Sequence, residues 1–172
     1  MWKYLASFAA LAAAWFGLMQ WPPASEFVRG RVDNNLGVLY SKGIGVAKDP
    51  AAAVRWWTLA AGHGSAAGEI NLAFALQNGA GVAMDEGAAA RWYERAARQG
   101  VVEAANNLGT LYANPTTRKP DLVLARVWFK RAQRLGDRDL SATIADNLAT
   151  LERDMTDAQL ARSNELLAER YP

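Results

Sequence analysis

The sequence contains no cysteine and only one histidine, His63, among its 172 residues. Without cysteine the chain can form neither a disulfide framework nor a thiolate metal site. A single histidine excludes a zinc site with several histidine ligands and allows at most one serine–histidine pair. No nucleophile stands beside a suitable base, so we expect no catalytic residue, no cofactor and no bound metal.

An excess of charge of one sign is also lacking: 19 Lys and Arg against 17 Asp and Glu give a net charge of +2. This balance is too even to favour binding to nucleic acid. The charges are nevertheless segregated, because residues 118–138 contain 7 basic and 2 acidic side chains, whereas residues 139–172 contain 3 and 7. Hydrophobic residues make up 51% of the chain, which indicates a folded domain.

An apolar run occupies residues 4–21, with Lys3 before it and two prolines directly after it. Its length lies between that of a signal-peptide core and that of a helix spanning a bilayer. We predict that residues 1–24 form a signal anchor, with a membrane helix through residues 4–21; a cleaved signal peptide and a buried amphipathic helix remain alternatives. The positive N-terminal flank favours a single-pass inner-membrane protein whose remaining chain faces the periplasm, or a periplasmic or secreted protein after cleavage.

The rest of the chain is repetitive, with segments starting at Asn35, Asn71 and Asn107 that align without gaps at a spacing of 36 residues. Many positions are identical in all three segments. They include Leu36/Leu72/Leu108, Asp49/Asp85/Asp121, Ala53/Ala89/Ala125, Trp56/Trp92/Trp128, Ala60/Ala96/Ala132 and Gly64/Gly100/Gly136. So many matches at one fixed offset identify an internal repeat.

Each repeat is predicted to form two helices. The aspartates at position 49 and its equivalents are placed as N-caps of the second helices, and the glycines at position 64 and its equivalents end them. Ala53, Ala60 and either Trp56 or Trp57 would form the buried stripe of the second helix, and Gly37 lets a neighbouring helix approach closely. Units this short cannot bury their own apolar faces, so they must stack into a solenoid.

The pattern N-L-G-x-x-Y-x-x-G-x-G-V-x-x-D-x-x-x-A-x-x-W-x-x-x-A-A-x-x-G resembles the Sel-one-like repeat (SLR), a relative of the tetratricopeptide repeat. The resemblance covers residues 29–136, and the third unit departs from it, because NPTTRKPD at 114–121 replaces the glycine loop at unchanged length. It implies an all-α, tetratricopeptide-like α/α solenoid of three repeats over residues 25–138.

Beyond Gly136 the repeat register fails, and a different signal follows. Thr156 with Gln159 forms a capping box for a last helix from about Asp157 to Arg170. A terminal unit needs a polar outer face to end the stack in water. Residues 139–172 are therefore predicted to be a C-terminal pair of capping helices.

In tetratricopeptide-like solenoids the first helices of successive units line a concave surface. The resemblance therefore implies a groove formed by Asn34, Asn35, Val38, Lys42, Ile70, Asn71, Phe74, Asn78, Glu103, Asn106, Asn107, Thr110 and Asn114. An asparagine amide both donates and accepts, which suits it to hold a peptide backbone. Alternatively, Asn35, Asn71 and Asn107 form hydrogen bonds between adjacent helices within the stack.

Three basic residues, Arg126, Lys130 and Arg134, fall on one stripe of the third unit's second helix. The stripe is either a solvated face or a docking patch for an acidic partner, for anionic lipid headgroups, or for the chain's own acidic cap. It lacks interleaved exposed aromatic residues, which argues against binding to single-stranded nucleic acid.

Taken together, these patterns predict a non-enzymatic adaptor of a bacterial-type cell envelope that binds a protein or peptide partner in the groove. One alternative is a secreted hydrolase of the β-lactamase-like SLR type, but those proteins contain a disulfide in each unit and this chain has no cysteine. The other alternative is an assembly factor that is tethered to the inner membrane and faces the cytoplasm.

Overall fold

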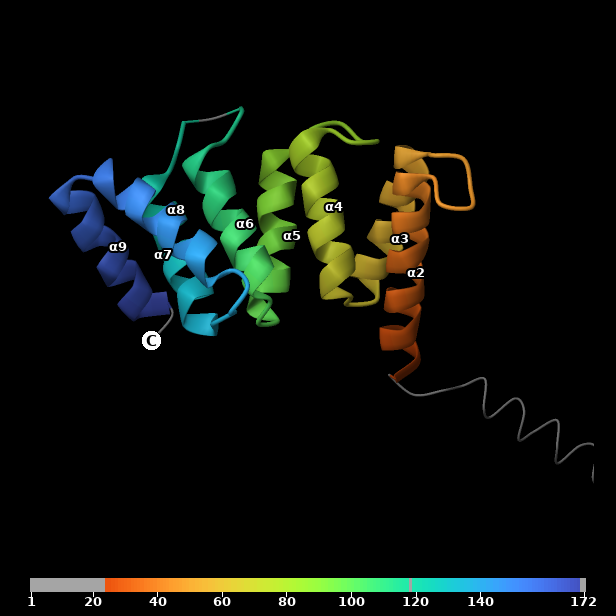
Figure 1. Cartoon of the computed structure of the whole chain (residues 1–172), viewed down its shortest axis with the longest axis horizontal. Helices are drawn as coiled ribbons and strands as arrows, with labels where there is room; N and C mark the ends of the chain where they lie inside the picture. Colours follow the sequence, from red (N-terminus) through yellow and green to blue (C-terminus); the bar gives the residue numbers. More distant parts are fainter. Residues whose placement is uncertain (1–23, 118, 171–172) are drawn as a thin grey trace, which may run out of the picture.

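The computed structural model describes residues 24–117 and 119–170, and within these ranges all regular structure is α-helical (Figure 1). The helices are α2 (Ala24–Lys42), α3 (Pro50–Gly62), α4 (Ala66–Asn78), α5 (Glu86–Arg98), α6 (Val102–Ala113), α7 (Leu122–Leu135), α8 (Ser141–Arg153) and α9 (Asp157–Arg170). None of these helices has the length and apolar character needed to cross a membrane. The membrane helix predicted in residues 4–21 lies outside the described residues.

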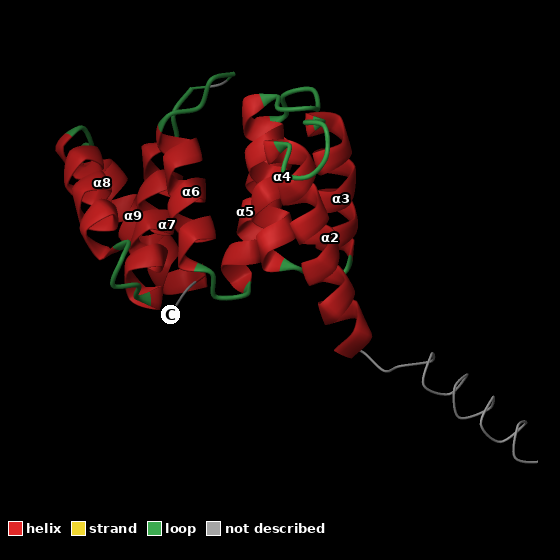
Figure 2. Ribbon diagram, turned by 45° about the vertical axis from the view of Figure 1, so that its right-hand side comes forward, coloured by secondary structure: helices red, strands yellow, loops and turns green. Residues whose placement is uncertain are grey.

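The helix pairs follow one another in chain order, from α2 and α3 at one end to α8 and α9 at the other (Figure 1). Each unit is a pair of packed helices, α2 with α3, α4 with α5, and α6 with α7, and each pair packs against the next. The loops inside the three units emerge together at one end of the helices (Figure 2). The predicted all-α solenoid is confirmed, with α8 and α9 packed on α7 at its C-terminal end.

The predicted helix caps form as expected. The side chains of Asp49, Asp85 and Asp121 each accept a hydrogen bond, of 2.8–2.9 Å, from the backbone N–H three residues further along. These bonds satisfy N–H groups that have no partner inside the helix. The capping box of α9 is also present, because Thr156 and Gln159 each accept a hydrogen bond from the other's backbone N–H.

Aromatic side chains fill the space between the two helices of a unit. The sequence left open whether Trp56 or Trp57 does so in the first unit, and the structure selects Trp57, which is buried, whereas Trp56 is half-buried. Its ring lies so close to α2 that a Cβ atom added to Gly37 would stand 2.4 Å from Trp57 Nε1. Phe129 lies against Gly109 in the same way, so glycine in the first helix makes room for an aromatic ring in the second.

Small residues also bring consecutive units together. Gly68 at the start of α4 packs on α3, where an added Cβ would lie 2.4 Å from the Cβ of Ala60. Ala104, the equivalent of Gly68 in the third unit, is fully buried. The first helix of one unit therefore packs closely on the second helix of the unit before it.

The loop of each later unit rests on the start of the preceding unit's second helix. In the second unit, Gly81 lies against Pro50, at the N-terminus of α3. In the third unit, Thr117 stands 36 residues after Gly81 and contacts Glu86, which stands 36 residues after Pro50. The two contacts are thus equivalent, although one is a backbone packing contact and the other is polar.

Glu86 explains how the loop of residues 114–121 keeps its place without the glycines. Its buried carboxylate accepts hydrogen bonds from the backbone N–H groups of Thr116 and Thr117 and from the Thr117 hydroxyl. Burial by itself would raise the pKa of Glu86, but the bonds from Thr117 and Thr116 together outweigh it and hold that pKa below its usual value. The departure from the repeat pattern therefore replaces a steric contact with a network of hydrogen bonds.

The Gly81 contact can be tested with a matched pair of substitutions at equivalent positions. Gly45 and Gly81 both have positive φ, at 72° and 78°, so alanine is strained at either one. A Cβ on Gly45 would meet no described atom within 4 Å, whereas one on Gly81 would stand 2.3 Å from the Pro50 backbone. We expect Gly45→Ala to lower the free energy of unfolding by about 1 kcal/mol and Gly81→Ala by about 3 kcal/mol or more.

Urea unfolding of both variants at pH 7, followed by circular dichroism, measures the two changes. Equal losses for Gly45→Ala and Gly81→Ala would show that the loop does not rest on α3.

Candidate functional site

A cavity of about 410 Å³ opens between the first helices of the first two units, α2 and α4. The residues that line it are Val38, Ser41, Lys42, Lys48, Pro50, Trp57, Asn71, Phe74, Ala75 and Ala80. Four of these, Val38, Lys42, Asn71 and Phe74, belong to the groove predicted from the sequence. The structure thus places predicted groove residues from two different helices around one cavity.

The walls of this cavity are mostly apolar. Phe74 is 57% exposed although it is a large aromatic residue, so much of its ring is not covered by the described part of the chain. Trp57 is buried, and its indole N–H has no acceptor among the described residues. An apolar cavity with one exposed aromatic ring is typical of a site that accepts a side chain of a partner.

Two lysines supply the charge of the cavity. Lys42 and Lys48 both line it and both are exposed. Neither forms an ion pair within residues 24–117 and 119–170, and no acidic residue lines the cavity. Asp49, next to Lys48 in sequence, caps α3 instead and lies 3.8 Å from Arg55.

A second cavity, of about 180 Å³, lies at the equivalent position two units further along, between α6, α7 and α8. Phe129 takes the place of Trp57, Thr110 that of Val38, and Asn114 that of Lys42. Thr110 and Asn114 were predicted as groove residues. The rest of the lining is formed by Ala113, Leu122, Asn147, Thr150, Leu151 and Asp154. The two cavities share their position in the repeat but differ in size and chemistry.

Asparagines connect the first helices of neighbouring units. The Asn71 amide donates a hydrogen bond of 2.8 Å to the Asn34 side-chain oxygen. Asn147 donates a bond of 3.1 Å to Asn106 in the same way, between α6 and α8. The sequence left open whether Asn71 holds a bound peptide or bonds to an adjacent helix; the structure shows the bond to the adjacent helix.

The same connection is missing between α4 and α6. Ile70 stands where Asn34 and Asn106 stand in the other units, and it packs against the hydrophobic core. Asn107 consequently has no side-chain partner in the described part of the chain, and it is partly exposed. The sequence allowed for a bond between helices at Asn71 but did not identify Asn34 as the partner, although the offset of 37 residues between the two could have indicated it.

The remaining predicted groove residues line neither cavity. Asn35 and Glu103 are exposed on α2 and α6. Asn78 ends α4, and its amide donates a hydrogen bond of 2.8 Å to the Phe74 backbone carbonyl. Asn35 and Glu103 therefore lie on the surface, and the structure does not bring them together in one site.

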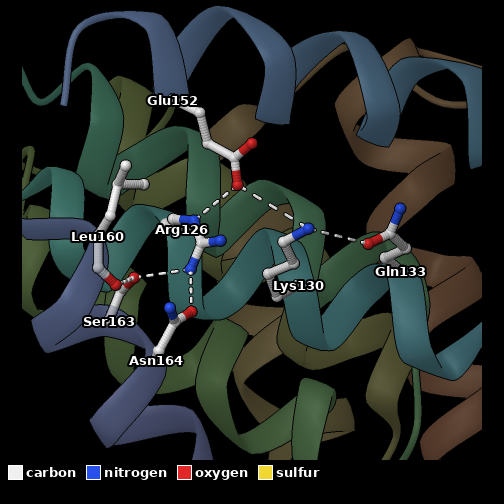
Figure 3. A network of polar contacts seen from close by, with 7 residues as sticks. All are labelled: Arg126, Lys130, Gln133, Glu152, Leu160, Ser163 and Asn164. Carbon is white, nitrogen blue, oxygen red and sulfur yellow. Dashed lines mark hydrogen bonds and ion pairs between the residues drawn. The ribbon is translucent and has the colours of Figure 1, made fainter. Parts of the chain in front are cut away.

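Arg126 and Lys130 of the basic stripe of α7 contact the C-terminal helices (Figure 3). Arg126 is 11% exposed, and its Nε lies 2.6 Å from the Glu152 carboxylate on α8. Its Nη1 donates to Ser163 Oγ at 2.7 Å and to Asn164 Oδ1 at 2.8 Å on α9. Lys130 Nζ lies 3.8 Å from the same Glu152 carboxylate.

Of the partners considered for this stripe, the chain's own acidic cap is thus the one that Arg126 and Lys130 contact. Arg134 lies in the last turn of α7, where it is exposed. Arg126 is mostly buried and contacts both α8 and α9, so it holds the C-terminal helices on α7.

His63 takes part in a pair that recurs in the repeat. Its Nδ1 lies 2.8 Å from the Asp33 carboxylate, which joins the end of α3 to α2. Gln99 donates a bond of 2.9 Å to Glu69 at the equivalent positions of the second unit. Burial raises the pKa of Glu69, while Arg95, 2.7 Å away, and the Gln99 bond oppose this rise. The described residues contain no group of three or more side chains suited to hold a metal ion.

The Sel1 repeat pattern matches the chain over residues 33–65, 66–101 and 102–137. A protective antigen present in uropathogenic Escherichia coli strains and displaying an SLR fold has a similar structure, with a TM-score of 0.68, 32% sequence identity, and coverage of 80% of this chain and 28% of that one. A Sel1 repeat protein from Oxalobacter formigenes is also similar, with a TM-score of 0.59, 30% identity, and coverage of 83% and 57%. The chain thus spans less than two thirds of either protein, and no curated protein matches its sequence.

Proposed function

The chain belongs to the Sel1 repeat family, whose members are generally protein-interaction scaffolds, and we propose that it binds a segment of a partner polypeptide along its first helices, α2, α4 and α6. The partner segment enters the cavity between α2 and α4, which is called the α2–α4 cavity below. This is a binding function without catalysis or a cofactor.

The observation that supports this proposal most strongly is the convergence of groove residues at the α2–α4 cavity. Val38 and Lys42 come from α2, Asn71 and Phe74 come from α4, and Trp57 comes from α3. The volume of about 410 Å³ falls within the range of about 300–1,000 Å³ that is usual for ligand pockets. Phe74 is 57% exposed where it lines the cavity, so its ring is available for contact with a partner.

Photo-crosslinking in the cells that make the protein tests this proposal. A photoreactive phenylalanine analogue is placed at Phe74 in the full chain and, as a matched control, at Leu59 of α3, which is also apolar and is 50% exposed. We expect a crosslink to a polypeptide partner from position 74 and none from position 59. Val38→Asp should abolish the crosslink at 74 while the chain keeps its helical circular-dichroism spectrum, because Val38 lines the cavity and is partly exposed. Equal crosslinking from both positions would contradict the assignment to the first helices.

We also propose a location in the cell envelope, with the repeats in the periplasm and residues 4–21 in the inner membrane. The support is the uncharged apolar run and the positive charge of Lys3 before it. The same anchor with the opposite orientation would leave the repeats in the cytoplasm.

Two fusions at the C-terminus distinguish the orientations. Alkaline phosphatase is active only when exported, whereas green fluorescent protein fluoresces in the cytoplasm. We expect an active phosphatase fusion and a dark fluorescent-protein fusion. The reverse pattern would place the repeats in the cytoplasm and contradict the proposal.

A further inference from the structure

The two equivalent cavities differ in a way that specifies the chemistry of the ligand. We infer that the α2–α4 cavity accepts a large apolar side chain of a partner segment that has a carboxylate group beside it. This inference rests on the proposed function, because it names the kind of polypeptide segment that the first helices bind.

The apolar part of the inference follows from the walls of the cavity. Val38, Trp57, Phe74 and Ala75 offer carbon surface from three helices. A leucine or aromatic side chain that enters between them removes the exposed ring of Phe74 from water. The Asn71 amide is already bonded to Asn34, and the Ser41 hydroxyl donates to the Val38 backbone carbonyl. Apart from the two lysines, the donor that remains is the Trp57 indole N–H, which has no acceptor among the described residues.

The carboxylate follows from the charge of the cavity. Lys42 and Lys48 both line it, and neither is neutralised by an ion pair within the described residues. No acidic side chain lines the cavity, so nothing there repels an incoming carboxylate. Two like charges without a counter-charge at an apolar cavity favour a partner of the opposite sign, both in rate of association and in specificity.

The cavity between α6, α7 and α8 shows that this chemistry is not a consequence of the repeat itself. Asn114 replaces Lys42 and Thr110 replaces Val38, and Asp154 is the only charged residue in its lining. A carboxylate of the partner segment is therefore attracted to Lys42 and Lys48 at the α2–α4 cavity and repelled by Asp154 at the cavity between α6, α7 and α8. Unlike charges at equivalent cavities fix the direction in which a segment lies along the first helices.

A carboxylate in a polypeptide is either an Asp or Glu side chain or the free C-terminus. Both present the same anionic oxygens to Lys42 and Lys48, so the structure favours neither source. The experiment must therefore separate the two.

Selection of random peptides against the full chain in detergent micelles tests the inference. Enriched peptides are synthesised with Asp and Glu intact or changed to Asn and Gln, and with a free or amidated C-terminus; fluorescence anisotropy then gives the Kd. We expect peptides that place a carboxylate next to a large apolar residue. Lys42→Glu with Lys48→Glu should weaken binding about tenfold, and Phe74→Ala should weaken it at least as much.

Arg91→Glu with Lys119→Glu is the matched control, because both residues are exposed and neither lines the cavity. This control should leave Kd unchanged. Peptides that depend on Phe74 but show no carboxylate preference and tolerate the Lys42 and Lys48 reversal would overturn the inference and leave the proposed function standing. Failure to obtain any peptide whose binding depends on Phe74 would overturn both.

Discussion

The structure depends on the close contact between the first helix of one unit and the second helix of the unit before it. No helix pair can bury its apolar surface alone, so the stability and the shape of the solenoid both come from stacking of the pairs. Gly68 against Ala60 sets how near α4 comes to α3, and Gly81 on Pro50 holds the loop of the second unit at the end of the first. These contacts fix the separation of α2 and α4 and thereby form the cavity between them.

Equivalent positions keep the geometry of the stack while their chemistry changes. Glu86 does by hydrogen bonding what Pro50 does by packing, and the Gln99–Glu69 pair stands where the His63–Asp33 pair stands in the first unit. Variation at positions that hold the stack is compensated in this way. The linings of the two cavities differ as well, since Asn114 stands where Lys42 stands and Thr110 where Val38 stands.

The sequence predicted the period, the helix pairs and the aspartate caps because these depend on local signals repeated three times. The resemblance to the repeat family implied that Phe74 and Val38 are groove residues, from their place in the first helix. The place of Lys48 in the lining of the cavity was not predictable, because it depends on how a loop folds back on α3. The Arg126–Glu152 contact was left as one of several alternatives, since α8 follows a break in the repeat register and its placement is set by packing on α7.

If stacking forms a ligand site between α2 and α4, Trp57 belongs to it, because its side chain lines that cavity. Its indole N–H is buried and has no acceptor within the described residues, so its NMR signal reports on that cavity. The direct measurement is a titration of the ¹⁵N-labelled chain with an acidic, apolar peptide that binds it, with the Trp57 signal assigned by Trp57→Phe. We expect a saturable shift of the Trp57 signal, with a midpoint at the Kd of the peptide, and no shift of the Trp128 signal. Saturated binding that leaves the Trp57 signal unchanged would contradict it.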